Sequence, residues 1–160
     1  MDSSATEVLG RAWLTSQLVR ERIELARPER DIGTDLIAYA PDVAWMLPLQ
    51  LKAIGLDGFT VFRAYVGRPL GLVYVLLADA DGGQHGRAET GAYLLTPEDA
   101  WGLPAALGRK LAPDHVTYRF GTLNRALVQV LDSRRVQPGT WNARLRALAP
   151  LRRACPGREG

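Results

Sequence analysis

The sequence predicts an α/β protein in which helices flank a mixed β-sheet. Three observations lead to this class. Short alternating segments near the N-terminus are joined by connections so short that neighbouring strands must run antiparallel. A continuous apolar run at residues 71–78 is typical of a central strand that is buried on both faces. Helical periodicity precedes and follows these strands, at residues 4–19 and 123–136.

The N-terminal half is expected to contain one helix and then several strands. Ser4 and Glu7 have the spacing of a capping box that starts the helix, and Gly10 and Ala12 would let it lie close to a sheet. Its predicted inward face consists of Ala5, Val8, Leu9, Ala12, Trp13 and Val19. Alternation and turn residues then predict strands at residues 21–27, 36–40, 46–53 and, as a short extended piece, 59–62.

The C-terminal half predicts further strands at residues 92–95 and 116–120. Thr96 and Pro97 mark the start of a helix that reaches about Leu107. The helix predicted at 123–136 has Leu123, Leu127, Val130 and Leu131 inward, and a last helix covers 139–149. Residues 79–86 predict a polar turn. We expect residues 1–150 to form a single domain and residues 151–160 to form a basic, flexible tail.

The amino-acid composition limits the classes of protein to which this chain can belong. The chain is 47% hydrophobic and 23% charged, as is usual for globular proteins. No apolar run approaches the roughly 18 residues of a membrane span, and the N-terminus lacks the basic and apolar regions of a signal peptide. Cys155 is the single cysteine, so no internal disulfide can form. These features predict a cytoplasmic protein without a membrane partner.

The cations are almost all arginines. Lysine and arginine together number 20, and only Lys52 and Lys110 are lysines, which leaves 18 arginines and a net charge of +3. The planar guanidinium of arginine binds two phosphate oxygens at once better than the ammonium of lysine does, which is compatible with a nucleic-acid partner. A GC-rich genome explains the same composition, so both interpretations stay open.

Polar residues on two neighbouring predicted strands suggest a metal site. Asp35 directly precedes the second predicted strand, and Gln50 and Lys52 share one face of the third. Asp35, the Gln50 amide and the Leu51 carbonyl offer oxygens to a divalent ion. Lys52 would hold the attacking water or the charge that grows on a phosphate. Glu7 would add a second carboxylate if its end of the helix faces these strands.

The order of these residues resembles the PD-(D/E)xK nuclease superfamily, whose members include type II restriction enzymes, very-short-patch repair endonucleases and archaeal Holliday-junction resolvases. The resemblance lies in a helix with Glu7, then Gly33-x-Asp35, then Gln50-x-Lys52 closing a third strand, and it covers roughly residues 5–78. The segment 27–39 also looks like small bacterial proteins of that fold.

The resemblance implies a restriction-endonuclease-like fold that hydrolyses DNA phosphodiester bonds with Mg²⁺ or Mn²⁺. It implies that Asp35 is the metal-binding acid, Lys52 the lysine of the motif, and Glu7 the helix acid of resolvase-like members. Gln50 occupies the second acidic position, where Asp or Glu is usual, and removes one negative charge from the ion's surroundings. Thr34 replaces the motif's proline. Many nucleases of this fold are dimers, so the resemblance also suggests a homodimer.

Simpler interpretations exist for each residue of this set. Glu7 would serve only as the capping-box residue, Asp35 would close a turn after Gly33, and Gln50 with Lys52 would be the solvated face of a strand. Nearby, a loop with cations around an aromatic predicts contacts with a DNA backbone, or else a solvated loop: Arg63, Tyr65 and Arg68, with Arg30 beside it. Two functions follow, an active metal-dependent endonuclease, or a catalytically degraded fold that binds nucleic acid or protein.

Overall fold

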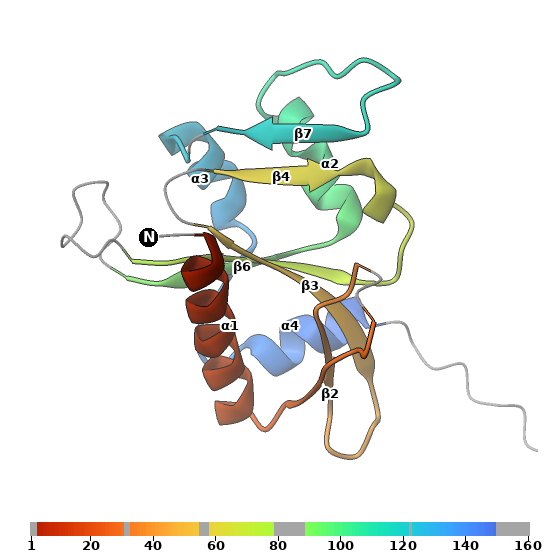
Figure 1. Cartoon of the computed structure of the whole chain (residues 1–160), viewed down its shortest axis with the longest axis vertical. Coiled ribbons are helices and arrows are strands. Elements are labelled where there is room, and N and C mark those ends of the chain that lie inside the picture. The colour runs from red at the N-terminus through yellow and green to blue at the C-terminus, as the bar shows by residue number, and fades with distance from the viewer. Residues whose placement is uncertain (1–2, 31–32, 55–57, 79–88, 122, 150–160) are drawn as a thin grey trace, which may run out of the picture.

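The computed structural model describes residues 3–30, 33–54, 58–78, 89–121 and 123–149 (Figure 1). Its strands are β1 (Glu24–Ala26), β2 (Leu36–Tyr39), β3 (Met46–Ile54), β4 (Phe59–Phe62), β5 (Gly71–Leu76), β6 (Gly91–Leu95), β7 (Thr117–Phe120) and β8 (Arg135–Val136). Its helices are α1 (Ser3–Arg20), α2 (Pro97–Ala106), α3 (Arg125–Asp132), α4 (Trp141–Leu148) and the short 3-10 helix η1 (Arg63–Tyr65). The predicted turn at 79–86 and tail at 151–160 lie outside the described residues.

A mixed sheet forms the centre of the fold. Within the described residues its six strands lie in the order β1-β2-β3-β5-β6-β8. Strands β1, β2 and β3 are antiparallel neighbours, β3 and β5 run parallel, and β5, β6 and β8 are again antiparallel. Every residue of β5 is buried, as predicted for a central strand. Strands β4 and β7 form a separate antiparallel pair. The predicted α/β class, a mixed sheet flanked by helices, is confirmed.

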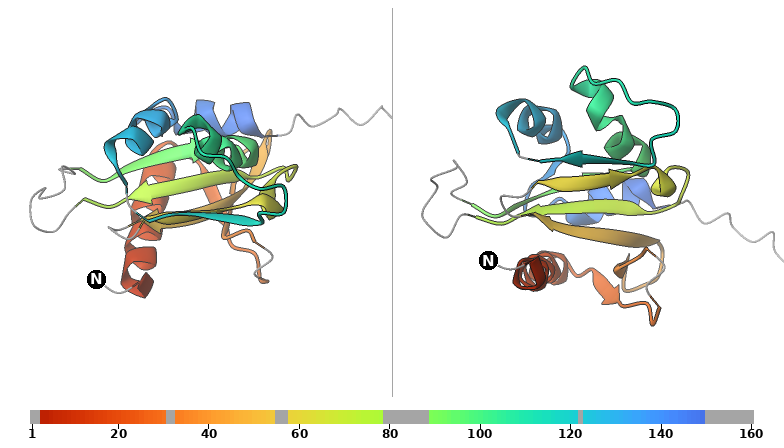
Figure 2. Two further views of the ribbon diagram at one scale, coloured as in Figure 1. Left: turned by 90° about the horizontal axis from the view of Figure 1, so that it is seen from above. Right: turned by 45° about the horizontal axis from the view of Figure 1, so that its top comes forward.

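The two faces of the sheet belong to different hydrophobic clusters. On one face, Leu51 of β3 packs with residues of α1 and α4. On the other face, Ile54 of β3 packs with α2, α3 and the β4–β7 pair. Figure 2 shows α1 and the β4–β7 pair on opposite sides of the sheet. Because side chains at i and i+2 share a face, Gln50 and Lys52 belong to the face of the β4–β7 pair.

The inward face predicted for α1 is wrong in part. The buried residues of this helix are Gly10, Leu14 and Leu18, one on each successive turn. Several residues expected to point inward are exposed instead: Val8, Leu9, Ala12 and Val19. Apolar residues lie all around this helix, so periodicity does not select a face. Because Gly10 permits a close approach, the helix face that carries Gly10, Leu14 and Leu18 is the one turned toward the sheet.

No helix of the described residues is long and apolar enough to span a membrane.

Capping was predicted at two helices, and the prediction is wrong at α1 and confirmed at α2. Helix α1 already includes Ser3, so Ser4 lies inside the helix and is not its N-cap. The Glu7 carboxylate accepts a hydrogen bond from Arg11 at 2.5 Å, an i,i+4 ion pair. The start of α2 is as predicted. There the Thr96 hydroxyl accepts a hydrogen bond from the Asp99 amide at 3.0 Å. In turn, the Asp99 carboxylate accepts a hydrogen bond from the Thr96 amide.

Gly10 is a point of close contact between α1 and the sheet. A Cβ atom at position 10 would lie 2.4 Å from the Cβ of Ala53. We expect Gly10→Ala to lower the free energy of unfolding by about 1–2 kcal/mol, because overpacking outweighs the gain in helix propensity. Adding Ala53→Gly should restore most of that loss. Denaturant unfolding of the two single variants and the double variant measures the coupling free energy between residues 10 and 53. Simple addition of the two single-variant free-energy changes would contradict the contact between them.

The helix predicted over residues 123–136 is shorter than expected. Asn124 caps α3 by accepting from the Leu127 amide at 2.9 Å, and the predicted inward residues Leu127 and Leu131 are buried. Residues 135–136 leave the helix and form β8 against β6. The edge of β6 offers backbone hydrogen bonds that helical periodicity does not reveal, so the tertiary pairing decides the end of this helix.

The turn between β2 and β3 holds Val43 at a φ of 54°. The turn is closed by the Val43 amide, which donates to the Ala40 carbonyl at 2.8 Å. A side chain with a Cβ branch in this left-handed region costs about 1–2 kcal/mol. We expect Val43→Asn to raise the free energy of unfolding by about 1 kcal/mol, since asparagine tolerates the region better. Thermal unfolding measures the change, and Val43→Thr is the matched control. Equal stabilisation by threonine would contradict the argument.

Candidate functional site

Asp35, Gln50 and Leu51 are joined by hydrogen bonds where β2 begins. The pairing of Leu36 with Leu49 places Asp35 opposite Gln50, and the Asp35 amide donates to the Leu49 carbonyl at 2.9 Å. One oxygen of Asp35, Oδ2, accepts from Gln50 Nε2 at 2.6 Å and from the Leu51 amide at 2.7 Å. The carboxylate is therefore fixed against β3 by one side chain and one backbone group.

Gln50 carries a buried oxygen that lacks a partner. The residue is 6% exposed, and among the described residues it is the one polar or charged residue that is buried. Because its Nε2 donates to Asp35, its Oε1 points elsewhere, and no described residue donates a hydrogen bond to that oxygen. A buried acceptor without a partner costs about 1–3 kcal/mol. A cation or a donor at Oε1 would remove that cost.

Leu51 and Lys52 continue the same strand. The amide and carbonyl of one strand residue point to the same side, so the Leu51 carbonyl faces the side on which its amide binds Asp35. Lys52 is half-buried and pairs with Tyr74 across β3 and β5. Burial raises the pKa of Tyr74 well above its ordinary value, and nearby Tyr65 raises it further. Tyr74 therefore stays neutral at physiological pH beside the Lys52 ammonium.

The loop after β4 lies against the turn that precedes Asp35. Gly33 has a φ of 80°, and a Cβ there would lie 3.2 Å from Nη1 of Arg68 and 3.3 Å from Cε1 of Tyr65. The backbone angle favours glycine at this position, and the ends of the two side chains leave little room for a Cβ atom. The Gly67 amide donates to the Glu98 carboxylate at 2.8 Å, which fastens this loop to the start of α2 and lowers the pKa of Glu98.

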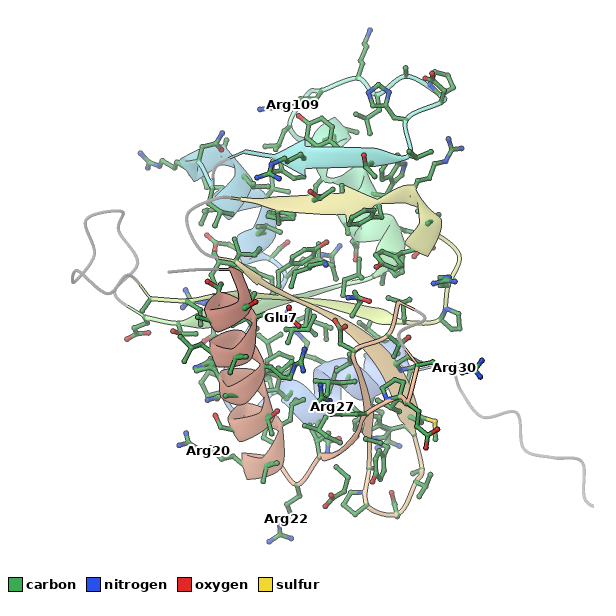
Figure 3. The ribbon with its side chains drawn as sticks, viewed as in Figure 1. Glu7, Arg20, Arg22, Arg27, Arg30 and Arg109 are labelled. Atoms are coloured by element: carbon green, nitrogen blue, oxygen red, sulfur yellow. The ribbon has the colours of Figure 1, made fainter. Side chains whose placement is uncertain are left out.

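Of the four predicted DNA contacts, two touch the turn that precedes Asp35. Tyr65 and Arg68 are the pair that contacts the Gly33 turn. The guanidinium of Arg63 donates to the carbonyl of Pro113, in the loop before β7. Arg30 is exposed in the segment between β1 and β2, at the margin of the molecule in Figure 3.

Glu7 is not brought together with Asp35. Helix α1 packs on the opposite face of the sheet from Gln50 and Lys52. The exposed Glu7 side chain pairs with Arg11 of the next turn, on the part of α1 that Figure 3 labels. The second carboxylate that the resemblance implies is therefore not among the contacts of Asp35 in the described residues.

The residues around Asp35 offer a modest set of oxygens to a divalent ion. They are the Asp35 carboxylate, the partnerless Gln50 Oε1 and the Leu51 carbonyl. Mg²⁺ is often held by only one or two carboxylates together with waters and substrate phosphates, so this set fits such an ion. Among the described residues no three His, Cys, Asp or Glu side chains converge, so a site closed by protein ligands alone is not formed there.

Sequence reasoning missed Arg119. It lines a cavity of about 240 Å³ together with Lys52, although the two residues lie on different sheets. The only signal in the sequence was a cation within the strand predicted at 116–120, and nothing there indicates which strand pairs with it. Comparisons with protein-family models, with curated proteins and with solved structures found no match for this chain.

Proposed function

We propose that this chain is a metal-dependent endonuclease-like protein of the PD-(D/E)xK type, which hydrolyses DNA phosphodiester bonds. One observation carries the proposal. The Asp35 carboxylate is held by Gln50 and the Leu51 amide, while Gln50 Oε1 is buried without a partner among the described residues, on the strand face that also carries the half-buried Lys52. A carboxylate, an amide oxygen in need of a cation, and a lysine on one face suit metal-assisted phosphoryl chemistry.

Asp35, Gln50 and the Leu51 carbonyl would hold the Mg²⁺ or Mn²⁺ ion. Such an ion, when bound, polarises the phosphodiester and activates water for attack. The Leu51 amide keeps the Asp35 carboxylate at the strand edge, so its orientation costs no further ordering when substrate arrives. Lys52 supplies a fixed positive charge for the oxygens of the pentacovalent phosphate.

Tyr65 and Arg68 are suited to hold the substrate strand. Both contact the Gly33 turn just before Asp35, and the Gly67 bond to Glu98 limits the motion of their loop. A guanidinium binds phosphate oxygens with two parallel donors, and contacts of this kind position a nucleic acid without reading its sequence. Location in the cytoplasm, as the sequence predicts, would give the protein access to DNA.

The proposal is tested by cleavage assays with the purified chain. We expect nicking or cleavage of at least one of supercoiled plasmid, linear duplex and four-way-junction DNA in Mg²⁺ or Mn²⁺. EDTA should abolish the activity, and Asp35→Asn should abolish it with both ions. No cleavage of any of these substrates in either ion would contradict the enzymatic function.

A second candidate function is binding of nucleic acid without cleavage. The hydrogen bond from Gln50 Nε2 to Asp35 favours it, because the amide satisfies the carboxylate where an ion would otherwise do so. This function predicts that wild-type protein binds DNA equally well in EDTA and in Mn²⁺. It also predicts that Asp35→Asn leaves the affinity for DNA unchanged in both conditions.

A further inference from the structure

The cavity beside Lys52 lies between the end of β3 and the β4–β7 pair. Strand β3 contributes Lys52, Ala53 and Ile54 to its wall, and the β4–β7 pair contributes Phe59, Thr60, Phe62 and Arg119. Its volume is about 240 Å³. The cavity therefore starts at the lysine of the candidate site and extends away from Asp35, toward the smaller sheet.

Strand pairing explains why Thr60 and Arg119 line this cavity together. Phe59, Val61 and Phe120 point into the second hydrophobic cluster. Thr60 and Arg119 are paired directly across β4 and β7, and they take the other face. The two residues therefore lie side by side, and both line the cavity together with Lys52.

The described lining of the cavity carries positive charge. Its two charged lining residues are Lys52 and Arg119, and none of the described residues that line it is acidic. Two cations that face one recess focus a positive potential on it. A guanidinium with several donors, an ammonium and a hydroxyl are groups that bind the oxygens of a phosphate, and Arg119, Lys52 and Thr60 supply them here.

We propose that this cavity binds one phosphate of the DNA strand, adjacent to the phosphodiester that is hydrolysed at Asp35. The inference rests on the proposed function for its choice of ligand. Pockets for drug-sized molecules measure about 300–1,000 Å³, so a smaller recess suits a phosphate with part of its sugar. Lys52 borders both places, and a strand anchored at Arg119 is thereby held with its next phosphate close to Asp35.

The test is DNA binding without metal, so that cleavage plays no part. A short fluorescein-labelled duplex is titrated with each protein in EDTA, and the anisotropy is followed. We expect Arg119→Ala to weaken binding about 10-fold, as for loss of a charged hydrogen bond. The matched control is Arg20→Ala, which removes the same charge at the far end of α1 from Glu7 (Figure 3) and should weaken binding less than about 2-fold.

Further variants keep the test decisive if Arg119→Ala folds poorly. Thr60→Val should weaken binding without changing the charge, and Arg119→Lys should bind better than Arg119→Ala. Millimolar inorganic phosphate should displace the duplex from wild-type protein but not from the alanine variant. Equal affinities of the Arg119→Ala and Arg20→Ala proteins would overturn the phosphate site, whatever the cleavage assays give. Asp35→Asn, which abolishes cleavage under the proposed function, should leave this binding intact.

Discussion

Replacing Lys52 by methionine is expected to lower the rate of Mn²⁺-dependent DNA cleavage by at least about 100-fold. The substitution keeps an unbranched aliphatic chain in the half-buried position beside Tyr74 and removes only the ammonium. The lost charge is the one proposed to face the phosphate in the transition state. The measurement is the initial rate of plasmid nicking at saturating Mn²⁺.

Lys110 provides the matched control, because it is the chain's only other lysine and is exposed in the loop between α2 and β7. Lys110→Met changes the net charge equally and should leave the cleavage rate within about 2-fold of wild type. Lys110→Met should unfold within about 0.5 kcal/mol of wild type, as surface substitutions do. Equal activity of the Lys52→Met and Lys110→Met proteins would show that Lys52 takes no part in the reaction.

Replacing Gln50 by glutamate is expected to destabilise the metal-free protein by about 3 kcal/mol at pH 8. Gln50 Nε2 now donates to Asp35 at 2.6 Å, and the substitution replaces this donor with a second carboxylate in a buried position. Burial and the like charge raise the pKa of the introduced carboxyl. A raised pKa in the folded state gives stability at low pH that is lost as the pH rises. The deficit relative to wild type should therefore be small at pH 5 and large at pH 8.

Divalent metal should reverse this loss. An ion between the two carboxylates neutralises their repulsion, so Mn²⁺ should raise the melting temperature of Gln50→Glu at pH 8 far more than that of wild type. The same change restores the usual acid of the motif, and cleavage should increase. Gln50→Met is the control, since it removes the donor without adding charge and should gain no stability from Mn²⁺. A Gln50→Glu protein that is equally stable in EDTA and Mn²⁺ would contradict the site.

The sequence predicted the strands better than the helices that cover them. Alternation and short connections sufficed for β1, β2 and β3, and an apolar run sufficed for the fully buried β5. The buried face of α1 could not be predicted, because its apolar residues surround the helix and the contact of Gly10 with Ala53 decides the packing. The end of α3 depends in the same way on β6, which is distant in sequence.

The candidate site was likewise predictable only in part from the sequence. Asp35, Gln50 and Lys52 share a face because alternation and an antiparallel register dictate it, and both can be inferred from neighbouring segments. The role of Glu7 depended on which face α1 covers, and helical periodicity cannot supply that information. Arg119 depends on the pairing of β4 with β7, two strands far apart in the chain. Local pattern therefore predicts groups on adjacent strands, whereas groups joined by long-range packing need the structure.

Calorimetric titration with Mn²⁺ tests the central claim most directly, because it asks whether Asp35, Gln50 and the Leu51 carbonyl hold an ion at all. Wild-type protein is expected to bind one Mn²⁺ per chain, and Asp35→Asn should bind none under the same conditions. Gln50→Glu should bind the ion more tightly than wild type, since it adds one negative charge. Absence of any Mn²⁺ binding by wild-type protein at millimolar concentrations would contradict the metal site.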